Sequence, residues 1–203
     1  MQNLKLSYFL FFLLALSACT KNETRYYADS QTPGVAVFSD KNFNLLTCFV
    51  NGRQWRTIDR TQGIIGPVHY EVDIEKLSTT GPLDTIGIKW NGYLNGNREN
   101  TSYIILVMQI PKIIGYSNLK AIDGKRFLID TVNSYFLING SDINPLHQKA
   151  SGSIYFHRAS LDSLSPGIYT GKIAGLFEAN FGNFKITNGR FDHFLDNKQI
   201  NFP

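Results

Sequence analysis

Short runs of β-forming residues, separated by Asn-Gly and Asp-Gly dipeptides, follow one another along most of this sequence. Residues 45–50, LLTCFV, are joined by Asn51-Gly52 to residues 53–58, RQWRTI. An Asn-Gly pair between two such runs favours a type I′ turn, because both residues accept positive φ angles. We therefore predict a β-hairpin over residues 45–58.

Apolar and polar residues alternate over residues 68–75, which is typical of a strand with one solvated face. One face carries Tyr70, Val72 and Ile74, and the other carries His69, Glu71, Asp73 and Glu75. Side chains on the same face of a strand lie about 6.6–7 Å apart. The acidic face is therefore expected to be solvated and paired with basic residues, and no metal site is predicted there.

The remainder of the chain repeats this pattern, and no stretch has a convincing helical period. Further strands are expected at residues 85–90, 102–110, 125–129, 135–138, 152–161, 167–181 and 184–195. Residues 102–110 are apolar on both faces, which predicts a central strand that Pro111 ends. Turns are predicted at Asp123-Gly124 and Asn139-Gly140, and one short helix near residues 144–150. Many short strands with Gly and Asn turns predict an all-β fold, a single antiparallel β-sandwich or barrel.

The N-terminal segment has the features of a secretory signal. Lys5 precedes an unbroken apolar run at residues 8–16, YFLFFLLAL, which is followed by small residues and Cys19. A positive start, a short apolar run and a small-residue cleavage region indicate export. The run is too short to span a bilayer, which needs about 20 residues.

Residues 16–19, Leu-Ser-Ala-Cys, resemble the lipobox of bacterial lipoproteins. The resemblance implies that Cys19 receives a diacylglyceryl group, that the chain is cut before it, and that further acyl chains of the palmitate type are added. Two or more chains anchor a protein stably, because each buried methylene contributes about 0.8 kcal/mol. In such families an aspartate after the cysteine favours the inner membrane. Thr20 in that position implies the outer membrane, on either its periplasmic or its outer face.

These features divide the chain into three parts. Residues 1–18 are expected to be a signal peptide, residues 19–40 a lipidated cysteine and flexible tether, and residues 41–203 a β-rich globular domain. A flexible tether of that length spans about 25 Å, which would hold the domain just clear of the lipid headgroups. Residues 35–38 are apolar enough to form a first strand, so the start of the domain is left open.

Two stretches, FVNGRQWRT at residues 49–57 and the segment from Gly152 to Asp192, resemble uncharacterised outer-membrane lipoproteins of the Bacteroidetes type. In that family an early V-N-G-K-x-W hairpin and a late I-T-x-G-x-F strand frame a domain of similar size. The resemblance implies a fold and a location, and it brings no activity.

Three Asp-Thr or Asp-Ser steps resemble the sites at which bacteria of that group attach sugars to exported proteins. They are Asp84-Thr85-Ile86, Asp130-Thr131-Val132 and Asp162-Ser163-Leu164. The resemblance implies Thr85, Thr131 and Ser163 as acceptors of O-linked glycans.

Little in the sequence indicates catalysis, and no catalytic residue, metal or cofactor is predicted. The four histidines lack zinc-type spacing, and neither a Gly-x-Ser-x-Gly elbow nor a phosphate-binding glycine loop is present. His157 and His193 are expected to face solvent or a packed edge. Cys48 lies in an apolar run and is expected to be a buried small hydrophobe rather than a reactive thiol. A net charge of +4 without clusters argues against nucleic-acid binding.

Residues 89–103, KWNGYLNGNRENTSY, are the candidate binding segment. Aromatic faces beside amide and guanidinium donors suit a glycan. The candidate residues are Trp90, Tyr93, Asn95, Arg98 and Tyr103. The alternative is a long hairpin loop whose Trp90 caps the core.

These observations together predict a lipid-anchored, non-enzymatic protein of the cell envelope that binds a glycan or a protein partner. A lipocalin-like barrel that carries a small apolar ligand is the alternative function. A large empty apolar interior would favour the carrier.

Overall fold

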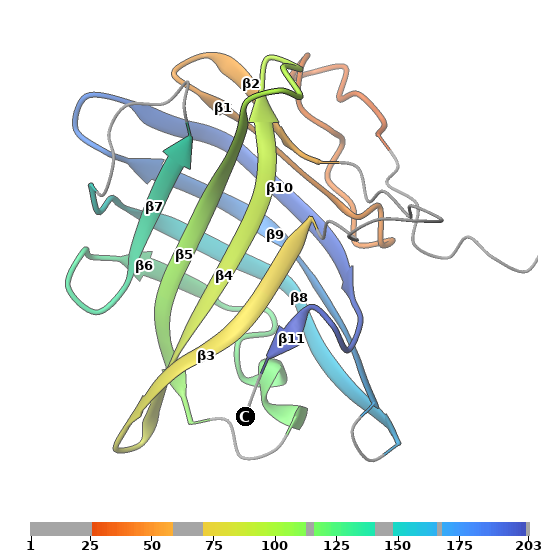
Figure 1. The fold of residues 1–203 in the computed structure, drawn as a ribbon, viewed down its shortest axis with the longest axis vertical. Helices are drawn as coiled ribbons and strands as arrows, with labels where there is room; N and C mark the ends of the chain where they lie inside the picture. The colour runs from red at the N-terminus through yellow and green to blue at the C-terminus, as the bar shows by residue number, and fades with distance from the viewer. Residues whose placement is uncertain (1–25, 59–70, 113–115, 141–147, 166–167, 202–203) are drawn as a thin grey trace, which may run out of the picture.

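The computed structural model describes residues 26–58, 71–112, 116–140, 148–165 and 168–201 (Figure 1). The strands are β1 (Leu45–Val50), β2 (Arg53–Thr57), β3 (Val72–Thr80), β4 (Leu83–Leu94), β5 (Thr101–Pro111), β6 (Arg126–Ile129), β7 (Tyr135–Gly140), β8 (Ser151–Ser165), β9 (Ile168–Asn180), β10 (Lys185–Leu195) and β11 (Ile200–Asn201). One short 3₁₀ helix, η1 (Tyr116–Ala121), lies between β5 and β6. The predicted all-β class is confirmed.

The strands form one sheet that curls into a nearly closed barrel (Figure 1). Neighbouring strands follow the order β7-β5-β4-β2-β1-β10-β9-β8-β6, and all of these pairs are antiparallel. β3 and β2 share one edge of β4, and β11 pairs in parallel with β3. Phe136 and Ala150 exchange two backbone hydrogen bonds of 3.1 and 2.9 Å, which tie β7 to the start of β8.

Several local predictions are confirmed. Asn51 and Gly52 have φ angles of 49° and 77°, as a tight turn between β1 and β2 requires. Gly124 also has a positive φ, and β5 ends at Pro111. Ile74 is buried and Glu75 exposed, as the alternation over residues 68–75 predicts.

Other local predictions are wrong. Asn139-Gly140 is the end of β7 and not a turn. Gly140 pairs with Ser102, and a Cβ at Gly140 would lie 2.3 Å from the Ser102 Cβ, so this glycine allows a close approach of two strands. Glu71 was expected on a solvated face, but its side chain is fully buried.

The short helix in the described part of the chain does not lie where the sequence predicted one. Most of residues 144–150 lie outside the described residues, and Ala150 is bonded to β7. Helix η1 lies at one end of the barrel, where Leu119 is fully buried in the core (Figure 1).

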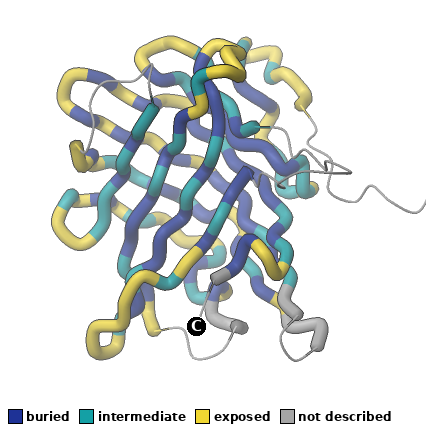
Figure 2. The backbone as a smooth tube through the Cα atoms, viewed as in Figure 1, coloured by how far each residue is buried: buried dark blue, intermediate teal, exposed yellow. Residues whose placement is uncertain are grey.

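Aromatic rings fill the centre of the barrel. Trp90 stacks on Phe177 with ring centroids 6.0 Å apart, and Phe191 lies 5.5 Å from Trp90. Phe136 contacts Phe177 at 5.6 Å, and Phe156 contacts Phe191 at 5.7 Å. Buried residues alternate with exposed ones along the strands around this cluster (Figure 2).

Glycines make room for these rings at two inward positions. A Cβ at Gly92 would lie 2.4 Å from the Trp55 ring, and a Cβ at Gly189 would lie 2.4 Å from the Phe177 ring. The Trp55 indole donates a 2.7 Å hydrogen bond to Ser102, which satisfies its N–H inside the barrel. Large aromatic rings thus fill the space that these glycines leave, which keeps the core closely packed.

Residues 26–40, which we name the N-terminal arm, pack against β1 and β10. Within the arm, Val37 donates a backbone hydrogen bond of 2.7 Å to Tyr27. The Ala36 amide donates to Thr47 Oγ1 of β1 at 2.8 Å, and the Arg190 guanidinium of β10 donates to the Ala36 carbonyl at 2.9 Å. The part of the expected flexible tether that the structure describes is therefore docked on the barrel.

Candidate functional site

The outer surface of β4, β5 and β7, together with the β4–β5 turn, carries a group of aromatic, amide and basic side chains. We name it the tyrosine face: Lys89, Asn91, Tyr93, Arg98, Tyr103 and Asn139. The sheet register places Tyr103 between Asn91 of β4 and Asn139 of β7. The Asn139 amide donates to the Tyr103 hydroxyl, and the Lys89 ammonium lies 4.8 Å from the centre of the Tyr103 ring. Tyr103 is half-buried, so part of this ring reaches solvent.

Tyr93 belongs to the tyrosine face, but its ring is covered by cations. Its side chain points outward from β4, yet it is only 2% exposed. The Arg56 Nε donates to the Tyr93 hydroxyl. The guanidinium carbons of Arg56 and Arg98 lie 5.1 and 5.9 Å from the ring centre, within cation–π range. A ligand approaching Tyr93 would therefore meet guanidinium groups before the ring.

The structure separates the five residues predicted to bind a ligand. Tyr93, Arg98 and Tyr103 come together on the tyrosine face. Asn95 is exposed in the β4–β5 turn with a φ of 51°. Trp90 points into the barrel and is fully buried. It therefore packs in the core, as the hairpin-loop alternative expects, but it lies within strand β4 and not in a loop.

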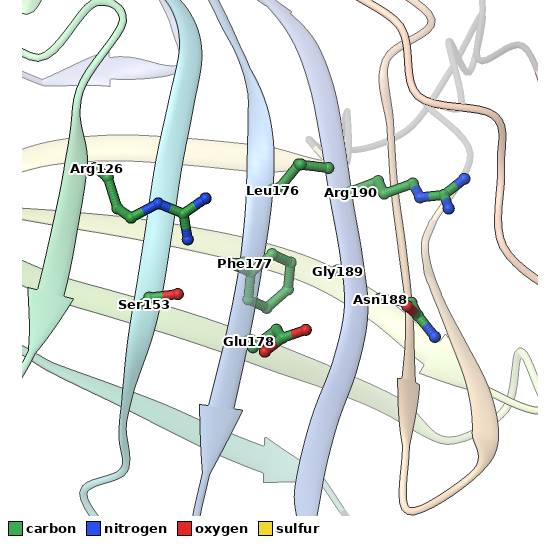
Figure 3. A pocket seen from close by; sticks show the side chains of 8 residues that line it. All are labelled: Arg126, Ser153, Leu176, Phe177, Glu178, Asn188, Gly189 and Arg190. Atoms are coloured by element: carbon green, nitrogen blue, oxygen red, sulfur yellow. The ribbon is translucent and has the colours of Figure 1, made fainter.

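A surface pocket of about 250 Å³ lies on another part of the barrel wall, over β8, β9 and β10. Its lining residues are Arg126, Ser153, Leu176, Phe177, Glu178, Asn188, Gly189 and Arg190. Figure 3 shows the side chains of Arg126 and Arg190 on either side of Leu176. Two arginines and Glu178 line this pocket, so it has no single charge. The Arg190 side chain also donates hydrogen bonds to Asp29 and to the Ala36 carbonyl of the N-terminal arm.

Sequence reasoning missed this pocket, although the sequence holds a signal for it. The register of β10 shifts between Ile186 and Gly189, and Asn188 has a φ of 54°. An Asn-Gly pair inside a strand pattern indicates a β-bulge, which bends the strand and re-aims its neighbours.

His193 is placed differently from the prediction. It is fully buried on β10, and neither ring nitrogen has a hydrogen-bond partner among the residues that the structure describes. Burial lowers the pKa of His193 to about 3, because a charged imidazole loses its hydration there. The expectation that His193 faces solvent or a packed edge is therefore wrong. His157 is exposed, with Nε2 3.8 Å from an Asp40 carboxylate oxygen.

Cys48 is a buried small hydrophobe, as predicted. Burial raises the pKa of its thiol far above the ordinary value, which disfavours the thiolate that a nucleophile requires. Within the described ranges, no group of three or more His, Cys, Asp or Glu side chains is arranged to hold a metal ion.

The residues predicted to be modified lie in different settings. Cys19 lies outside the described residues. Thr85 is half-buried on β4, between Ser78 and Gln109 in the register. Ser163 belongs to β8, and its side chain is not among those described.

Thr131 lies in the β6–β7 loop with a φ of 74°. The Asp130 carboxylate accepts hydrogen bonds from the backbone amides of Val132, Asn133 and Ser134. These bonds lower the pKa of Asp130, and they hold the loop in one conformation.

Among the described residues, no helix has both the length and the apolar character to cross a bilayer. Comparisons with protein-family models, with curated proteins and with solved structures find no match to this chain.

Proposed function

We propose that this protein is a lipid-anchored, non-enzymatic protein of the bacterial outer membrane that binds a glycan through the tyrosine face. The anchor is inferred from the apolar run and the lipobox-like residues 16–19. The observation that carries the binding proposal is the half-buried Tyr103 ring, flanked in register by two amide side chains and by a lysine.

This arrangement suits a sugar for a chemical reason. One face of a pyranose ring is apolar and packs on an aromatic side chain, while its hydroxyls need placed donors and acceptors. Asn91 and Asn139 carry both kinds of group, one on each side of Tyr103. The Asn139 amide also donates to the Tyr103 hydroxyl and the Asn91 amide to Asp73, which orients both side chains. Lys89 and Arg98 add donors that suit hydroxyl or carboxylate oxygens of an acidic sugar.

The interior of the barrel does not favour the carrier alternative. A carrier needs space for its ligand inside the barrel, as lipocalins have. Here the rings of Trp90, Phe136 and Phe177 contact one another at the centre. We therefore place the binding site on the outer wall.

The anchor is tested by Cys19→Ala in the full-length protein expressed in a bacterial host. The wild type is expected in the detergent phase of a Triton X-114 extraction, because several acyl chains hold it in lipid. The variant is expected to lose most of this partitioning. A wild-type mature chain that lacks acyl groups by mass spectrometry and stays in the aqueous phase would refute the anchor.

The binding site is tested with the purified protein on an array of neutral and acidic glycans, followed by calorimetry with the best ligand. Tyr103→Ala is expected to weaken binding by tenfold or more, in keeping with about 1.4 kcal/mol per factor of ten. Tyr103→Phe keeps the ring and is expected to bind more tightly than Tyr103→Ala.

Tyr155→Ala is the matched control for this test. Tyr155 is a half-buried tyrosine on β8 with the Arg126 guanidinium carbon 5.7 Å from its ring centre, on the pocket side of the barrel. Its loss is expected to leave glycan binding unchanged. If Tyr155→Ala weakens binding and Tyr103→Ala does not, the tyrosine face is not the site.

A further inference from the structure

Exposed apolar side chains gather where the N-terminal arm folds back on itself and Val37 bonds to Tyr27. Tyr26, Tyr27, Val37 and Phe38 are 38%, 55%, 42% and 37% exposed. They are four of the eight large hydrophobic side chains that are exposed in the described part of the chain. Such a concentration of exposed apolar side chains marks a contact surface.

The barrel holds this cluster in place. Tyr27 contacts the Phe43 ring at 5.1 Å, and Phe38 meets the His157 ring edge-on at 5.3 Å. Close to the cluster, the arm is fixed to β1 and β10 through Ala36. A cluster that is already ordered loses little conformational entropy when it meets a partner.

We propose that this exposed cluster of the N-terminal arm contacts the surface of the bilayer that holds the protein. The proposal rests on the lipid anchor at Cys19 in the proposed function. Only seven Cα–Cα steps separate Cys19 from Tyr26, which is at most about 25 Å of extended chain and about 15 Å for a flexible one. The exposed cluster is therefore the described part of the protein that the anchor keeps nearest to the lipid.

The chemistry of the cluster fits that surface. Tyrosine has an apolar ring and a polar hydroxyl, and it is enriched at membrane–water interfaces for that reason. Tyr26 and Tyr27 can place their rings among the headgroups while their hydroxyls stay hydrated. Val37 and Phe38 add apolar area beside them.

The test uses the full-length lipoprotein reconstituted in vesicles of phosphatidylethanolamine and phosphatidylglycerol with a nitroxide-headgroup lipid. A fluorophore is attached through Val37→Cys, because the native Cys48 is buried and Cys19 is acylated. The control is Leu128→Cys, at an 81% exposed position on β6, which is the third strand from β10 in the sheet order. We expect quenching at position 37 to be several-fold stronger than at position 128.

A double substitution tests the side chains themselves. Tyr27→Ser with Phe38→Ser is expected to lower the quenching at position 37 towards the level at position 128, while the protein stays in the detergent phase. Equal quenching at positions 37 and 128 in an acylated protein would overturn this proposal and leave the anchor standing. Absence of acylation at Cys19 would overturn the anchor, and this proposal with it.

Discussion

Replacing Trp90 by alanine is expected to lower the free energy of unfolding by about 3–5 kcal/mol. Trp90 is fully buried at the centre of the barrel, where it stacks on Phe177 and contacts Phe191. Removal of the indole takes away the contacts of both rings and leaves a cavity between β4 and β9 that neighbouring strands cannot fill. Chemical denaturation with urea, followed by circular dichroism, measures the loss.

Trp90→Phe is the matched variant for this prediction. It keeps one ring in the stack and removes the indole N–H, which has no hydrogen-bond partner among the described residues. We expect it to cost clearly less than Trp90→Ala, since a smaller cavity remains. If Trp90→Ala instead unfolds at the same urea concentration as the wild type, the side chain does not support the core. Because Trp90→Ala acts through stability, a loss of glycan binding in that variant would not identify a binding residue.

Trp90 and Tyr103 show which part of the candidate site could be predicted from the sequence, because the structure places one inside the barrel and the other outside. Both residues stand in one aromatic-rich segment, and the strand period alone separates inward Trp90 from the outward residues of β4. The predicted strands at residues 85–90 and 102–110 end at Trp90 and begin beside Tyr103, and residues 91–101 between them were not assigned to a strand. The structure continues β4 to Leu94 and starts β5 at Thr101, which sends Trp90 inside and Tyr103 outside.

Most strands and several turns were predictable because they depend on neighbouring residues. The Asn51-Gly52 turn and the end of β5 at Pro111 follow from local backbone preferences. The contacts that sequence reasoning missed join residues far apart in the chain. The docking of the N-terminal arm depends on Arg190 reaching Asp29 and Ala36, and no local pattern in either segment indicates that pairing.

Acidification is expected to destabilise this protein through His193. The pKa of His193 is about 3 in the folded protein, whereas an unfolded chain has the ordinary value of 6.5. Between these two values the unfolded chain binds a proton at this residue and the folded protein does not. Unfolding therefore takes up a proton, and the stability falls as the pH is lowered from about 6.5, by about 1.4 kcal/mol per pH unit. Above that pH, His193 does not change the free energy of unfolding with pH, because it is neutral in both states.

His193→Leu isolates this effect from the other titrating groups. The variant cannot bind the proton in either state, so the difference in unfolding free energy between variant and wild type is expected to grow as the pH falls. From pH 6.5 to 4.5 the variant is expected to gain about 2–3 kcal/mol relative to the wild type. At pH 7 it is expected to be at least as stable, because leucine removes two buried ring nitrogens that lack partners.

Urea denaturation at a series of pH values measures the prediction. His157→Leu is the control, because it removes an exposed histidine of β8 and leaves the buried His193 in place. Parallel pH profiles for His193→Leu and the wild type would mean that the imidazole gains its proton without unfolding the barrel. In that case water reaches His193 in the native state, and the packing around β10 is looser than the buried ring implies.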